Sequence, residues 1–100
     1  MDRSSVIKLI SQTYTQDAIG QQVPHEISRS VYCNVASVSA KEWFDAGQAG
    51  LNPQYKLTLF APDYQGETIV ELEGKRYAVY RTYRSTNELL ELYLERKAGI

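Results

Sequence analysis

The segment Tyr55-Lys56-Leu57-Thr58-Leu59 is the clearest structural signal in the chain, because tyrosine and leucine alternate along it with the polar residues lysine and threonine. Successive side chains of a strand point to opposite faces, so this pattern is typical of a strand with one buried and one solvated face. The run that follows, residues 61–66, is dense in turn formers, among them Pro62 and Gly66. A half-buried strand at 55–59 is therefore the centre of the predicted fold.

Two segments after these turns predict a hairpin. Val70 and Leu72 alternate with acidic residues, which indicates another half-buried strand. Gly74 follows in a tight connection, where a glycine can adopt a positive φ angle. The chain should therefore return as a strand over residues 76–84, with the next turn at 85–87.

The segment after that turn fits two structures. Leu90, Leu92 and Leu94 alternate as in a strand, whereas Leu89 and Tyr93 would also lie on one side of a helix. Its length and the preceding hairpin favour the strand, because an antiparallel meander continues in this way.

Two extended segments are expected before the central strand. Residues 5–14 mix β-branched apolar side chains with threonine, which favours a strand over a helix. A polar connection follows at 16–22. Pro24 lacks an N–H group and is typical of the beginning or edge of a strand, so we expect the next strand to cover residues 27–35.

The period changes between residues 36 and 54, where a short helix is predicted. Ser39 and Glu42 have the spacing of a capping box at a helix N-terminus. Gly47 or Gly50 can end the helix in the left-handed conformation. A helix of barely two turns is marginal alone, so it must lean on the rest of the domain or on a partner.

The chain length of 100 residues is enough for one domain with a modest core, and we expect a single domain over residues 1–100. The segments above amount to about six short strands joined by turns. Such a series suggests a mainly β fold, a small antiparallel β-barrel, because closing the sheet removes exposed strand edges. Residues 36–54 form a long loop that carries the short helix.

Composition excludes several classes of function. Eleven basic and twelve acidic residues leave a net charge of −1, which does not predict tight nonspecific binding to a polyanion. The single cysteine cannot form an internal disulfide, and no apolar run approaches the ~18 residues of a membrane span. The first residues lack the profile of a signal peptide, so we expect a chain made in a cytoplasm, with no membrane partner.

No residue cluster is arranged for catalysis, so we expect no enzymatic activity. His25 and Cys33 lie eight residues apart, but no third group is visible that would orient a base against the thiol. Cys33 alternates with valines and is expected to be a small buried hydrophobe. Glu67, Glu71 and Glu73 are expected on a solvated face. No cofactor site is predicted, and a lone histidine with a lone cysteine cannot complete a metal site.

Arginine and tyrosine residues alternate irregularly in residues 76–84. Proteins can bind single-stranded nucleic acids with such residues, because bases stack on tyrosine rings and arginines contact phosphates. Period two places Arg76, Tyr80 and Arg84 on one face and Tyr77, Arg81 and Tyr83 on the opposite face. The mixture is therefore divided between the core and the surface. Because both residue types are also enriched at protein interfaces, a small oligonucleotide-binding-like module remains an alternative.

Several short blocks occur in an order that resembles a known family. They are the Val35-Ala36-Ser37-Val38 segment continuing to Pro53, the Tyr80-Arg81-Thr82-Tyr83 block and the Glu91-Leu92-Tyr93 ending. Together they resemble the head–tail joining proteins of long-tailed bacteriophages, also called head-closure or stopper proteins. The resemblance covers about two thirds of the chain, from about Ser28 to the C-terminus. It implies a small antiparallel β-barrel with one long excursion at residues 36–54 and a final strand.

The resemblance also implies a function. Proteins of this family are structural virion components that form a ring beneath the portal and its adaptor. They close the DNA-filled head and present the surface to which the tail binds. The expected partners are the portal/adaptor and tail proteins of a phage or prophage and copies of the chain itself. A monomer is expected in isolation, in the bacterial host cytoplasm before assembly, and contact with DNA in the channel is expected where the excursion enters it.

The predicted partner interface centres on the excursion. Aromatic residues dominate interface energetics, so Trp43 and Phe44 are the expected anchors. The segment should be mobile in the free protein and ordered in the ring. The expected interface residues are Ser37, Lys41, Glu42, Trp43, Phe44, Gln48, Tyr64, Arg81 and Arg84.

Overall fold

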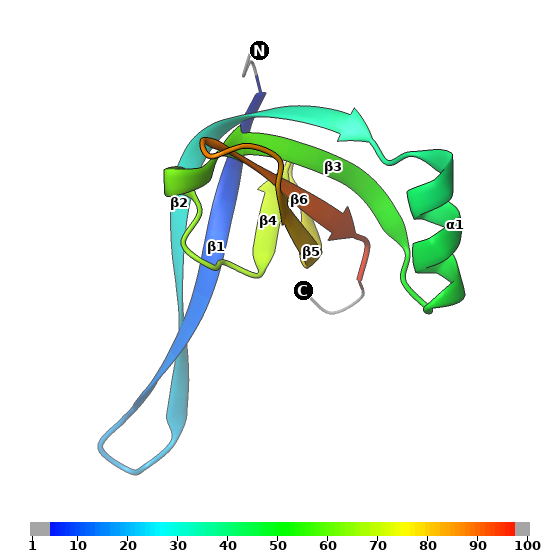
Figure 1. The fold of residues 1–100 in the computed structure, drawn as a ribbon. Coiled ribbons are helices and arrows are strands. Elements are labelled where there is room, and N and C mark those ends of the chain that lie inside the picture. The colour runs from blue at the N-terminus through cyan, green and yellow to red at the C-terminus, as the bar shows by residue number, and fades with distance from the viewer. Residues whose placement is uncertain (1–4, 98–100) are drawn as a thin grey trace.

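The structure, a computed structural model, describes residues 5–97 as six antiparallel strands, one α-helix and a short 3-10 helix (Figure 1). The strands are β1 (Ser5–Gln16), β2 (Gln22–Ser37), β3 (Pro53–Phe60), β4 (Ile69–Leu72), β5 (Lys75–Arg84) and β6 (Leu89–Glu95). The helices are α1 (Ala40–Gln48) and the 3-10 helix η1 (Ala61–Asp63). No helix within residues 5–97 has the length and apolar character needed to cross a membrane.

The six strands form one closed antiparallel sheet in the order β1-β2-β3-β6-β5-β4. The circle is completed by a short pairing of β4 with β1, in which Lys8 lies opposite Glu71 and Ile10 opposite Ile69. This arrangement confirms the predicted mainly β, barrel-like fold. It also confirms that the last segment is a strand, since β6 lies between β3 and β5.

Alternating side chains of every strand fill the interior of the barrel. Leu57 and Leu59 of β3 are fully buried, as the central sequence pattern predicts. Thr58 is also buried, although it points to the outer face, because it lies between Asn34 and Glu91 on the neighbouring strands. The core cluster consists of Ile7, Leu9, Val31, Cys33, Leu57, Leu59, Val70, Leu72, Tyr77, Leu92 and Leu94.

The predicted hairpin between β4 and β5 is confirmed. Glu73 and Gly74 connect the strands with φ angles of 52° and 79°. Two successive positive φ angles are those of a type I′ turn, whose twist matches that of the flanking strands. Glycine adopts this conformation without steric cost, which explains its place in the turn.

The segment between η1 and β4 carries a buried ion pair. The Nε atom of Arg29 on β2 donates to the Glu67 carboxylate at 3.2 Å, and a second guanidinium nitrogen donates to the Asp63 carbonyl at 2.7 Å. Tyr64 donates its hydroxyl to the Glu67 carbonyl at 2.6 Å. The prediction of a solvated Glu67 is therefore wrong: its side chain is almost fully buried because an arginine distant in sequence satisfies its charge.

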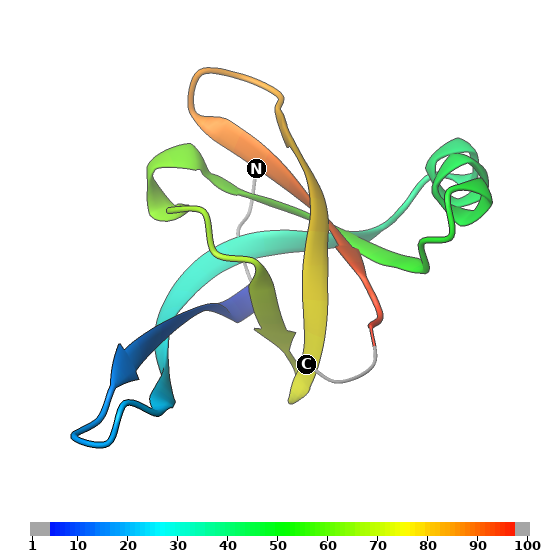
Figure 2. The same ribbon diagram turned by 90° about the horizontal axis from the view of Figure 1, so that it is seen from below.

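Strands β1 and β2 run beyond the barrel as a twisted two-stranded ribbon, which we call the arm (residues 11–30). The arm projects to one side of the barrel and α1 to the other, and both views show this (Figures 1 and 2). The arm ends in a tight turn, in which the Asp17 carboxylate accepts from the N–H groups of Ile19 and Gln21 at 3.0 and 2.9 Å. The molecule therefore has two projections instead of the single excursion expected. The strand-free part of that excursion is 38–52, since β2 and β3 extend into it.

The regular alternation predicted for β5 is interrupted. The pairing of β5 with β6 shifts by one residue between Val79 and Arg81, which is the signature of a β-bulge. As a result Tyr77 packs in the core, whereas Arg81 lies on the outer face against Tyr93. The sequence-based assignment of both to one face is wrong because the bulge adds a residue to the strand.

Candidate interaction site

Helix α1 begins and ends as the sequence predicts. The Ser39 hydroxyl accepts a hydrogen bond from the Glu42 N–H at 3.1 Å and caps the N-terminus. At the other end, Gly50 has a φ of 84°, and the Leu51 N–H donates to the Ala46 carbonyl at 3.0 Å. This closing pattern is a Schellman motif, which requires the left-handed conformation that glycine favours.

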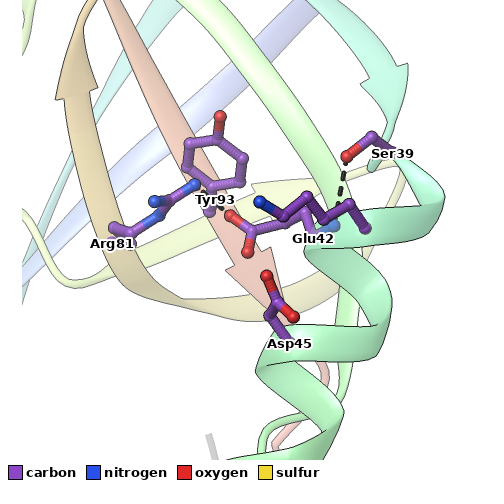
Figure 3. Close-up of a pocket in the computed structure, with 6 residues that line it drawn as sticks. Ser39, Glu42, Asp45, Arg81 and Tyr93 are labelled. Atoms are coloured by element: carbon purple, nitrogen blue, oxygen red, sulfur yellow. Dashed lines mark hydrogen bonds and ion pairs between the residues drawn. The ribbon is translucent and has the colours of Figure 1, made fainter.

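One ion pair connects α1 to the outer face of the barrel. The Glu42 carboxylate, instead of turning back to the N-terminus of the helix, pairs with the Arg81 guanidinium of β5. The guanidinium carbon of Arg81 also lies 4.1 Å from the centre of the Tyr93 ring. Figure 3 shows the Arg81 side chain reaching from β5 towards the Glu42 carboxylate, with the Tyr93 ring beside its guanidinium group. The Arg81 side chain has a fixed position because both a carboxylate and an aromatic face hold its guanidinium group.

A shallow pocket of about 230 Å³ lies between α1 and the barrel around this ion pair (Figure 3). Asp45 lies one turn after Glu42, so the helix contributes two carboxylates to the rim. The lining is mostly polar and carries both signs of charge, which suits a polar group of a protein partner. The lining residues are Ser39, Lys41, Glu42, Asp45, Arg81 and Tyr93.

Tyr80, next to the bulge, has a buried hydroxyl for which the described part of the chain offers no hydrogen-bond partner. Its ring lies 6.2 Å from that of Tyr93, centre to centre. Burial, and after it the negative charge of Glu42, raises the pKa of Tyr80 to about 12. The hydroxyl therefore stays protonated at neutral pH.

Two aromatic side chains of α1 are exposed. Trp43 is 59% and Phe44 58% accessible, whereas Ala46 is the buried residue of the helix. Exposure of a large aromatic side chain to water is unfavourable. Two adjacent exposed aromatic residues on a short helix are typical of a surface that binds another protein. Both predicted anchors are thus available to a partner.

The structure brings most of the predicted interface residues together. Those on α1 and on the end of β2 lie in one region, and Arg81 adjoins them across the ion pair. Arg84 is the last residue of β5, three residues beyond Arg81, and Tyr64 packs against the core. Residues of the region at α1 are Ser37, Lys41, Glu42, Trp43, Phe44, Gln48 and Arg81.

Sequence reasoning missed two residues of this region, Asp45 and Tyr93. Helical spacing alone would have placed Asp45 beside Glu42, since residues three apart share a helix face. Tyr93 had no comparable signal, because its contact with Arg81 depends on the bulge in β5.

The arginines that suggested nucleic-acid binding have partners within the chain. Arg76 forms two hydrogen bonds with the Glu26 carboxylate, at 2.8 and 2.9 Å. Arg81 pairs with Glu42, and Arg84 donates to the Asn87 carbonyl at 3.4 Å. Two of the three cations are therefore neutralised by a carboxylate, which weakens attraction to phosphates.

His25 and Cys33 lie in different parts of the fold. His25 is exposed on the arm, where its Nε2 atom lies 3.0 Å from the Thr15 hydroxyl. Cys33 is fully buried in the barrel core, which confirms its predicted role as a small hydrophobe. Among residues 5–97, no group of three or more histidine, cysteine, aspartate or glutamate side chains is placed to hold a metal ion.

Further apolar side chains are exposed on and near the arm. Tyr14, Ile19 and Ile27 belong to the arm itself, and Val6 lies directly opposite Tyr32 at its base. A second pocket, of about 300 Å³, lies near this pair and includes Val6, Val35 and Tyr55 in its lining.

The chain matches no model of a protein family and no curated protein.

Proposed function

We propose that this chain is a structural virion protein of a long-tailed phage or prophage. In this proposal, copies form a ring beneath the portal and its adaptor, close the DNA-filled head and provide the surface to which the tail attaches. The sequence blocks named above support it, as does a barrel-like fold with a helix in the segment where the resemblance implies an excursion.

The observation that carries the proposal is the pair of projections on opposite sides of the barrel (Figures 1 and 2). A ring of identical subunits needs a heterologous contact, in which one surface of a subunit meets a different surface of the next. The arm and α1 are two such different surfaces, and both carry exposed apolar side chains. The shape therefore suits repetition around an axis.

In this proposal α1 is the element that responds to assembly. The helix has nine residues and buries only Ala46, so its own stability is low. Local opening of such an element requires little free energy. Trp43 and Phe44 become buried when the ring, the adaptor or the tail covers the helix, and burial of two aromatic side chains then stabilises it.

A head-joining assay tests this role. DNA-filled heads that lack the protein are mixed with tails and purified protein from the source phage or prophage, and complete particles are counted. Trp43→Ala should reduce joining by at least about tenfold, as expected for an interface anchor. Trp43→Phe is the matched control, because it keeps an aromatic ring, and it should retain most of the activity.

Two results would contradict the proposal. Joining that is indifferent to the presence of the wild-type protein would exclude the structural role itself. Salt-sensitive binding of single-stranded DNA by the free monomer would instead favour the oligonucleotide-binding alternative. Because Trp43 is largely exposed, Trp43→Ala should leave the thermal stability of the isolated protein nearly unchanged.

A further inference from the structure

Strand β2 has a long edge without a neighbour among the described residues. It pairs with β1 along its whole length from Gln22 to Cys33, but its pairing with β3 begins only at Cys33. Residues 22–32 are thus paired on one side alone. All of them except Arg29 and Val31 are exposed.

The hydrogen-bonding pattern shows which residues face this free edge. The Asp17 N–H donates to the Gln21 carbonyl at 2.9 Å, so Asp17 and Gln21 form a hydrogen-bonded pair. Hydrogen-bonded and non-hydrogen-bonded pairs alternate along an antiparallel ladder. Even-numbered residues from Gln22 to Tyr32 therefore direct their backbone groups away from β1. Pro24 fits this set, because a residue without an N–H is tolerated where no ladder bond is donated.

Apart from Pro24 near the tip of the arm, this edge has little of the usual protection against pairing with another strand. Natural edge strands are commonly guarded by lysine or by free charge. The free edge of β2 has no lysine, and its two charged residues are engaged within the chain. Glu26 is held by Arg76, and Arg29 by Glu67.

Strand β5 offers a second free edge. Its pairing with β4 ends at Ala78, after which the Val79 N–H donates to the Thr68 carbonyl at 2.9 Å. Residues 81–84 pair with β6 on the other side and are exposed. In the described part of the chain, this stretch therefore also has backbone groups without a ladder partner on one side.

The two edges cannot meet within one molecule. In the closed sheet, β2 and β5 are separated by β1 and β4 in one direction and by β3 and β6 in the other. Each edge also carries an exposed aromatic side chain, since Tyr32 is 65% and Tyr83 57% accessible. A second copy of the chain can supply both a strand edge and an aromatic contact to each of these edges.

We propose that the free edge of β2 in one copy pairs with the free edge of β5 in the next. This contact adds a strand across the subunit boundary, and its main-chain hydrogen bonds provide the affinity. It is heterologous, because the arm of each copy binds β5 of its neighbour. The proposal specifies the subunit contact of the ring and so rests on the proposed function.

Self-association of the purified chain tests the contact. Sedimentation velocity should show a monomer at low concentration and weak association of the wild-type protein as the concentration rises. Ser28 is exposed, and its N–H points away from β1, so Ser28→Pro removes one donor from the free edge and leaves the β1–β2 ladder intact. We expect Ser28→Pro to associate roughly tenfold more weakly, as for the loss of a hydrogen bond at an interface. Ser28→Ala, which keeps the N–H, is the control.

Amide hydrogen exchange identifies the second edge. Peptides covering residues 24–32 and 80–84 should gain protection together as the concentration rises. Protection of 24–32 alone would mean that two arms pair with each other and would overturn the assignment to β5. Tyr32→Lys, which places a charge on the edge without changing the backbone, provides a second variant if Ser28→Pro unfolds.

Wild-type protein that stays monomeric at every concentration, or equal association of Ser28→Pro and Ser28→Ala, would overturn the contact. Neither result bears on the joining assay with Trp43 variants. The proposed function is tested separately, by whether joining depends on the protein and by whether the free protein binds single-stranded DNA.

Discussion

Arg81 of β5 lies face-on to the ring of Tyr93 on β6, with 4.1 Å between the guanidinium carbon and the ring centre. This position depends on the bulge after Val79, which turns Arg81 to the outer face. The same guanidinium pairs with Glu42, so the bulge in the barrel determines where α1 is held. A local irregularity of one strand is thereby coupled to the position of the helix that carries Trp43 and Phe44.

Removal of the Arg81 charge should loosen α1 and leave the barrel folded. Arg81 is about half exposed, so the ion pair contributes no more than about 0.5–1 kcal/mol. In Arg81→Ala, amide exchange within residues 40–48 should become about two- to fivefold faster, while exchange in β3 and β6 stays unchanged. Arg84→Ala is the control, since Arg84 donates to the Asn87 carbonyl in the turn after β5. Equal exchange rates in the two variants would show that the ion pair does not hold α1.

The buried Glu67 carboxylate should be important for stability. Although burial by itself raises its pKa, hydrogen bonds from Arg29 and from backbone N–H groups lower it overall. Glu67→Ala leaves Arg29 half-buried without its carboxylate, which should cost about 1–3 kcal/mol in the free energy of unfolding, measured with urea. Glu88→Ala, at an exposed position, should change it by no more than about 0.5 kcal/mol. An equally small effect of Glu67→Ala would mean that the pair is not needed to hold residues 61–68.

The barrel was predictable because its signals are local. Alternation in 55–59, the glycine turn at 73–74 and the capping serine at 39 each act within a few residues of the chain. The helix was found in the same way. The same kind of pattern identified Cys33 as a core residue before any contact was known.

The features that were missed depend on contacts between distant segments. The Arg29–Glu67 pair joins residues 38 positions apart, and neither side chain has a local pattern that indicates burial. The bulge in β5 appears only in its pairing with β6. The arm was predicted as two strands, but its projection follows from where β3 and β4 stop pairing, and no single segment specifies that.

Acid should weaken the attachment of the arm to β5. Hydrogen bonds from Arg76 and then from Gln12 lower the pKa of Glu26 to about 2, whereas the ordinary value of the carboxyl is 4.5. The unfolded chain therefore binds a proton at this group before the folded chain does. The stabilising contribution of Glu26 is complete above about pH 4.5 and is lost as the pH falls towards 2.

Glu26→Gln isolates this contribution. The difference in unfolding free energy between wild type and Glu26→Gln should be constant near neutral pH and should shrink between pH 4.5 and 2. Other carboxylates titrate equally in both proteins and cancel in the difference. A difference that does not change with pH in this range would show that the Glu26–Arg76 pair is absent in solution.

The Cys33 thiol should be inert in the folded protein. Its side chain is fully buried between core leucines and valines, and this burial raises its pKa to about 11. The thiolate is the reactive form, so both lack of access and lack of ionisation protect the sulfur. At pH 8, alkylation by iodoacetamide should proceed only as fast as the barrel opens, and urea should accelerate it in step with unfolding. Rapid labelling without denaturant would mean that β2 separates easily from its neighbours β1 and β3 at Cys33.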